Sequence, residues 1–91
     1  MNKPAILSVD DDPMVSAAIF RDLRRRYGDD YLVVKATSGA QALAALTKLA
    51  LRNQPIALIA TDQRMPGMTG IELLERAREH APDAKYLLLT A

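Results

Sequence analysis

Short apolar runs alternate with amphipathic segments along this chain of 91 residues. Each run consists mainly of aliphatic residues and is followed by turn-forming or helix-capping residues. Because the runs are almost continuously apolar, they predict strands that are buried on both faces of a sheet. The predicted strands are Ala5–Val9, Tyr31–Thr37, Ile56–Thr61 and Tyr86–Leu89.

The first amphipathic segment follows the first run directly and predicts a helix. Pro13 suits the first position of a helix, and Asp12 before it is expected to be the N-cap. The apolar residues recur at helical spacing to about Tyr27, after which Gly28 ends the helix. The residues that define this apolar spacing are Val15, Ile19 and Leu23.

Two further helices begin at sequence signals of the capping-box type. Ser38 with Gln41 opens a helix over residues 39–51, and Thr69 with Glu72 opens another that ends near residue 80, before Pro82. The residues expected to face the core are Leu43, Leu46 and Leu49 or Ala50 in the first of these helices, and Leu74 and Ala77 in the second.

The predicted order of elements is therefore βαβαβαβ. Helices that alternate with continuously apolar strands are typical of an α/β fold, with a parallel sheet, helices on both faces and right-handed crossovers. The sequence thus predicts a small doubly wound domain that occupies residues 1–91.

Composition narrows the classes of function. The chain is 49% hydrophobic but has only three Tyr and one Phe, so its core must be aliphatic. A net charge of +1 favours neither nucleic acid nor an acidic partner, and the absence of Cys excludes disulfides and thiol chemistry. No apolar run approaches the roughly 20 residues of a membrane span, and no signal peptide opens the chain. These features predict a soluble, cytoplasmic domain without a membrane partner.

Polar groups stand where three of the predicted strands end. Asp10 and Asp11 follow the first strand, Asp62 follows the third and Thr90 follows the fourth. The carboxyl ends of parallel strands meet at one edge of a sheet, where ligands bind in such folds. Converging carboxylates repel one another unless a cation lies between them, and oxygen ligands beside phosphate chemistry favour Mg²⁺. Thr90 could then bond a phosphoryl oxygen, with small Ala91 leaving room for access.

This arrangement closely resembles the receiver domain of two-component response regulators. Three segments carry the resemblance, each at a predicted strand end. They are Ile6–Asp11 (I-L-S-V-D-D), Asp62–Gly70 (D-Q-R-M-P-G-M-T-G) and Leu87–Ala91 (L-L-L-T-A). The resemblance implies a flavodoxin-like receiver fold, here with strand order 2-1-3-4.

The resemblance also implies a role for each residue. Asp62 would take a phosphoryl group from a sensor histidine kinase or a phosphotransfer protein, forming an aspartyl phosphate. Asp11 and Asp62 would ligate Mg²⁺ (or Mn²⁺), Asp10 would act mainly through water, and the backbone carbonyl of Arg64 would complete the protein ligands. Thr90 would be the switch hydroxyl. Such a domain promotes only its own phosphorylation and dephosphorylation, so it is not an enzyme in the ordinary sense.

The resemblance stops at Ala91, whereas receiver domains continue through a further helix, a fifth strand and a last helix. A lysine that contacts the phosphate and an aromatic residue that moves with the threonine belong to that later part. We therefore expect an incomplete receiver domain whose fourth strand, Tyr86–Leu89, is a bare edge. Two chains could pair through that edge as a homodimer.

Two other interpretations stay open at this point. One is a phosphohydrolase of the haloacid dehalogenase type, in which Asp10 is the nucleophile and Asp12 the general acid of a D-x-D motif. Met14 and the unexplained Asp62 loop speak against it. The other is a dimerisation module that works without phosphorylation.

Overall fold

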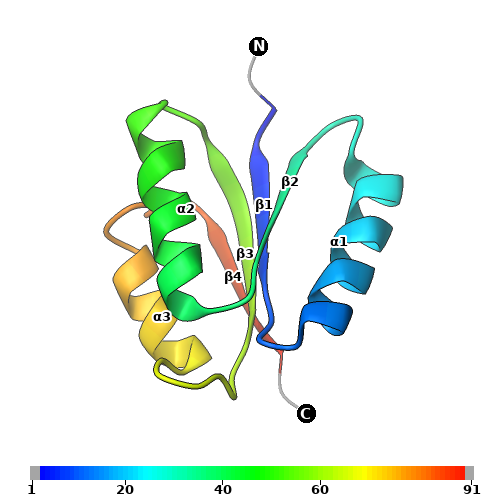
Figure 1. Cartoon of the computed structure of the whole chain (residues 1–91). Helices are drawn as coiled ribbons and strands as arrows, with labels where there is room; N and C mark the ends of the chain where they lie inside the picture. The colour runs from blue at the N-terminus through cyan, green and yellow to red at the C-terminus, as the bar shows by residue number, and fades with distance from the viewer. Residues whose placement is uncertain (1–2, 90–91) are drawn as a thin grey trace.

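A parallel sheet with helices on both faces forms the structure, a computed structural model that describes residues 3–89 (Figure 1). The sheet has the order β2-β1-β3-β4, and all of its described pairings are parallel. The elements in chain order are β1 (Ala5–Val9), α1 (Pro13–Tyr27), β2 (Leu32–Ala36), α2 (Gly39–Leu51), β3 (Ile56–Asp62), α3 (Gly70–Ala77) and β4 (Lys85–Leu89). The predicted doubly wound α/β fold with strand order 2-1-3-4 is confirmed.

Strand β1 lies between β2 and β3 in the sheet, and the uniform burial of its residues reflects that position. All of its residues are buried, as expected for a parallel strand with neighbours on both sides and helices above and below. Its last residue, Val9, aligns with Ala36 of β2 and with Thr61 of β3, while Asp62 aligns with Leu89 of β4. The carboxyl ends of the four strands are therefore level with one another.

The helices cover the two faces unequally, as Figure 1 shows, because α1 lies on one face while α2 and α3 pack side by side on the other. Helix α1 contacts β1 and β2, whereas α3 contacts β3 and β4. The fully buried large residues are aliphatic, in agreement with the composition. They include Leu7, Val9, Leu46, Ile59 and Leu73.

The inward face of α1 differs from the prediction. Ser16 is its one fully buried residue, Ile19 and Leu23 are only half-buried, and Val15 is 41% exposed. The physical reason is that α1 lies against two strands, so its apolar stripe meets only part of the sheet. Among residues 3–89, no helix makes more than a weak contact with β3 or β4 on the face that α1 occupies, and Leu87 and Leu89 are accordingly 48% and 39% exposed.

The other helices also refine the prediction. In α2, Leu46 and Leu49 are buried as expected, but Ala50 is exposed and Ala42 is the further core residue. In α3, the expected Ala77 is buried and the expected Leu74 is half-buried against the core, while Leu73 is a further buried residue that was not predicted. Helix α3 ends at Ala77 rather than near residue 80, and single turns carry the chain onward to β4.

The caps test the local signals directly. Asp12 caps α1, and Thr69 and Glu72 form the complete capping box of α3, as predicted. At α2 only half of the predicted box exists. Ser38 accepts from the Gln41 N–H, but the Gln41 side chain accepts from the N–H and hydroxyl of Thr37, one residue earlier than the box requires. Within residues 3–89, no helix is both long and apolar enough to cross a membrane.

Candidate functional site

Three aspartates converge at the carboxyl edge of the sheet. Asp10 directly follows β1, Asp11 is the next residue, and Asp62 is the last residue of β3 rather than the first beyond it. One carboxylate oxygen from each lies within 4.8 Å of the other two. Asp10 and Asp62 are half-buried and Asp11 is exposed, so the cluster opens to solvent on one side. The convergence predicted from the strand ends is therefore present.

The loop after β1 turns Asp10 toward the cluster and Asp12 toward the helix. The Asp10 N–H donates to the carbonyl of Ala36 at 3.1 Å, which extends the pairing of β1 with β2 by one residue. One carboxylate oxygen of Asp10 accepts from the Asp12 N–H at 2.9 Å. Asp12 in turn accepts from the N–H groups of Met14 and Val15, at 2.9 and 3.3 Å. Asp12 is therefore engaged as a helix cap and stands outside the acidic cluster.

Close packing fixes the loop that follows Asp62. Met65 is buried in the core, and Met68 packs against Gly39 at the start of α2, where an added Cβ would lie 2.6 Å from the Met68 sulfur. Gly67 adopts a φ of +79°, a conformation that glycine allows without strain. Both methionines therefore pack beneath this loop.

Gly70 lets the first turn of α3 approach the end of β3. A Cβ on Gly70 would lie 2.5 Å from the carbonyl oxygen of Asp62 and 2.7 Å from a methyl carbon of Leu88. Any other residue would push the helix away from the strand that presents Asp62. The sequence shows a glycine here, but only the structure explains it.

Negative charge at this edge is not balanced within the described part of the chain. Among residues 3–89, no Lys or Arg forms an ion pair with any of the three aspartates, and the one ion pair found there joins Asp22 to Arg25. The three available ligands are all carboxylate oxygens, the donor type that Mg²⁺ and Ca²⁺ take. The cluster is therefore suited to bind a divalent cation, which offsets two of its three negative charges.

The structure describes only some of the other predicted site residues. The side chain of Arg64 is exposed in the loop after β3, two residues beyond Asp62. Thr90 and Ala91, the predicted switch hydroxyl and its small neighbour, lie outside the described residues.

Gln63 is a residue that the sequence analysis did not single out. Its side-chain oxygen accepts from the N–H of Ile71 at 2.9 Å, and its backbone carbonyl accepts from the N–H of Gly70 at 3.0 Å. No local sequence pattern signals this role, because the partners stand seven and eight residues further along the chain.

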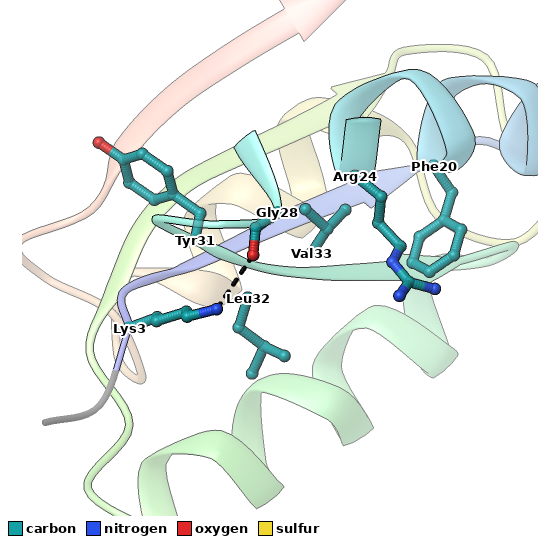
Figure 2. Close-up of a pocket in the computed structure, with 7 residues that line it drawn as sticks. All are labelled: Lys3, Phe20, Arg24, Gly28, Tyr31, Leu32 and Val33. Carbon is teal, nitrogen blue, oxygen red and sulfur yellow. Dashed lines mark hydrogen bonds between the residues drawn. The ribbon is translucent and has the colours of Figure 1, made fainter. Parts of the chain in front are cut away.

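A cavity of about 390 Å³ lies away from the acidic cluster, between the C-terminal half of α1 and the start of β2 (Figure 2). Its cations already have partners, since the Lys3 ammonium donates to the carbonyl of Gly28 and Arg24 lies over the ring of Phe20. None of the three aspartates lines it. The residues that line it are Lys3, Phe20, Arg24, Gly28, Tyr31, Leu32 and Val33. This cavity is therefore separate from the acidic cluster.

Known proteins resemble this chain over nearly its whole length. The family model of the response regulator receiver domain matches residues 6–91. The hydrogenase transcriptional regulatory protein HoxA of Cupriavidus necator is 34% identical over 85 residues, which are 93% of this chain and 16% of that protein. An adenylate cyclase from Rhodopirellula baltica superposes with a TM-score of 0.74 at 38% identity, over 99% of this chain and 60% of that one.

A further solved structure is relevant because of what it contains. It is a response regulator protein from Burkholderia pseudomallei with a phosphorylated aspartic acid, a calcium ion and citrate. It superposes with a TM-score of 0.74 at 28% identity, over 97% of this chain and 47% of that one. The present chain thus spans less than two thirds of the length of each of these three proteins.

Proposed function

Because this chain belongs to the family of response regulator receiver domains, we propose that it accepts a phosphoryl group on Asp62 with a divalent cation bound beside it. A receiver domain is a phosphoacceptor of two-component signalling rather than a catalytic enzyme. One observation carries the proposal, namely that oxygens of Asp10, Asp11 and Asp62 lie within 4.8 Å of one another at the carboxyl edge of a parallel sheet.

The chemistry of the donor set fits Mg²⁺ or Mn²⁺. Asp11 and Asp62 would hold the ion directly, Asp10 would act through water, and the backbone carbonyl of Arg64 would be the remaining protein ligand. A hard cation of this kind neutralises the charge on a transferring phosphoryl group. The half-buried Asp62 stands at the end of a rigid strand, which limits the orientations that its carboxylate can take.

The proposed reaction is a phosphoryl transfer from a phosphohistidine. A carboxylate oxygen of Asp62 donates an electron pair to phosphorus as the bond between phosphorus and the donor's imidazole nitrogen breaks. The imidazole, protonated on its other nitrogen, leaves as the neutral ring, and Asp62 becomes an acyl phosphate. The hydroxyl of Thr90 would then bond one phosphoryl oxygen, with Ala91 leaving that side open.

The partner that follows from this chemistry is a histidine kinase or a phosphotransfer protein, which we place with this domain in the cytoplasm. The net charge of +1 offers no strong field for nucleic acid, so we propose a protein partner alone. The phosphorylated aspartic acid and the calcium ion of the Burkholderia protein lend support, since that protein shares the fold.

A labelling experiment tests the proposal. The chain is incubated with a small acyl phosphate and Mg²⁺, reduced with borohydride to trap any acyl phosphate, and mapped by mass spectrometry. We expect label on Asp62, loss of label in Asp62→Asn, and normal label in the control Asp83→Asn, which alters an exposed aspartate just before β4. Label on Asp10 would support the phosphohydrolase interpretation instead, although Asp12 already serves as a cap.

A further inference from the structure

The N-terminus of α3 has no free hydrogen-bond donors. The first four N–H groups of a helix lack partners within the helix and must find them elsewhere. In α3, the N–H groups of Gly70 and Ile71 donate to the backbone and side-chain oxygens of Gln63, at 3.0 and 2.9 Å. The other two, from Thr69 and Glu72, are satisfied by the capping box, since the Thr69 N–H donates to the Glu72 carboxylate and the Glu72 N–H donates to the Thr69 hydroxyl. Gln63 therefore supplies half of this cap from outside the helix.

The position of Gln63 makes this cap unusual. It directly follows Asp62, and its own N–H donates to the carbonyl of Leu89 at the end of β4, at 3.3 Å. One half-buried residue thus joins the ends of β3 and β4 to the start of α3. The amide orientation is fixed by chemistry, because only the amide oxygen can accept from the Ile71 N–H.

These bonds close the loop that contains Arg64. Residues 64–69 form a loop whose two ends both lie beside Gln63, and several of its residues are exposed, including Arg64 and Gly67. Met65 and Met68 hold the middle of the loop by packing, and its two ends meet through Gln63 and the close approach of Gly70. Without the side-chain bond, one end of the loop loses a fixed partner.

We infer that Gln63 is a positioning residue that holds the loop carbonyls beside Asp62 in the geometry a small octahedral cation requires. This inference rests on the proposed function, because it assumes that the Arg64 carbonyl is a ligand. Mg²⁺ demands near-ideal octahedral geometry, whereas Ca²⁺ accepts longer and more variable arrangements. A loosened loop therefore weakens Mg²⁺ binding more than Ca²⁺ binding, so Gln63 contributes to the preference for Mg²⁺.

The test compares the two affinities in matched variants of the 91-residue chain. Gln63→Met keeps an unbranched side chain of similar length but removes the oxygen that accepts from Ile71. Gln63→Glu keeps an acceptor oxygen in the same place. Gln54→Met is the control, since it removes a glutamine hydrogen bond to the carbonyl of Lys3 at the opposite edge of the sheet. Titration calorimetry gives both dissociation constants, and amide exchange of Ile71 reports the hydrogen bond itself.

We expect Gln63→Met to weaken Mg²⁺ binding by roughly three- to tenfold, the range that one hydrogen bond supplies. Ca²⁺ binding should change less, so the ratio of the two affinities falls, and the Ile71 amide should exchange faster. Gln63→Glu should restore the ratio even though its added charge strengthens both ions' binding. The ratio should stay unchanged in Gln54→Met.

The outcomes separate this inference from the proposed function. An unchanged ratio in Gln63→Met, with Mg²⁺ bound normally by the unmodified chain, overturns the positioning role alone. Failure of the unmodified chain to bind any divalent cation overturns the proposed site and this inference together. If Gln63→Met does not fold, Gln63→Asn replaces it, because its shorter side chain withdraws the oxygen from Ile71 while staying polar.

Discussion

Replacing Asp62 with asparagine should stabilise the chain without a divalent cation and destabilise it, relative to the unmodified chain, when the cation is present. The substitution keeps the size of the side chain while removing one of three converging charges. Among residues 3–89, no ion pair involves Asp62, so no favourable charge pair is lost. Two repulsive pairs disappear, those of Asp62 with Asp10 and with Asp11.

The magnitude follows from the separation. Two unit charges 4.8 Å apart repel by about 1 kcal/mol at the dielectric constant of water and by about 3.5 kcal/mol at an effective value of about 20. Asp11 is exposed, and salt screens such pairs further, so the lower end applies. Removing both pairs should add about 1–2 kcal/mol to the free energy of unfolding. For a domain of this size, that corresponds to a rise in Tm of about 4–16 °C.

A bound cation should make the unmodified chain more stable than Asp62→Asn. A ligand that binds only the folded state adds about 2.7 kcal/mol when its concentration is 100 times its Kd. The unmodified chain should gain this stabilisation in Mg²⁺, whereas Asp62→Asn should gain little. Asp62→Asn should therefore have the higher Tm in EDTA and the lower Tm in Mg²⁺. Thermal melts followed by circular dichroism, with EDTA and then with millimolar Mg²⁺, measure both effects.

The matched control is Asp83→Asn, which removes an exposed carboxylate away from the cluster and should leave the Mg²⁺ shift intact. A lower Tm of Asp62→Asn in EDTA would show that repulsion is not the dominant effect at this edge. An equal Mg²⁺ shift in both chains would show that Asp62 is not a ligand.

Two further predictions concern packing. Gly70→Ala should lower the free energy of unfolding by about 1–3 kcal/mol, because its Cβ would collide with the Asp62 carbonyl; an unchanged urea midpoint would contradict the close approach. The isolated chain should self-associate at tens of micromolar through the β4 edge. Leu87→Lys should abolish this association. The control Leu51→Lys, at a position on α2 that is 80% exposed, should leave the association intact. Light scattering decides this, and a monomeric unmodified chain with a cooperative melt would refute it.

The sequence by itself determined the features that depend on neighbouring residues. Continuous apolar runs indicated buried parallel strands, and their order predicted the doubly wound sheet with the acids at one edge. The cap of α1 by Asp12 and the Thr69–Glu72 box were predictable because each partner lies within one helical turn. Parallel strands end at one edge, which is why the meeting of Asp10, Asp11 and Asp62 was also predictable.

Only the tertiary structure decided the features that depend on distant partners. The apolar spacing of α1 did not show that Val15 would be 41% exposed, because that depends on how much of the sheet lies beneath the helix. Gln41 accepts from Thr37 instead of Ser38, and although both residues lie within one turn of it in the sequence, the choice depends on where the end of β2 places the Thr37 N–H. The partners of Gln63 lie within its reach because α3 packs against the end of β3. No local sequence pattern indicates such hydrogen bonds to a following helix.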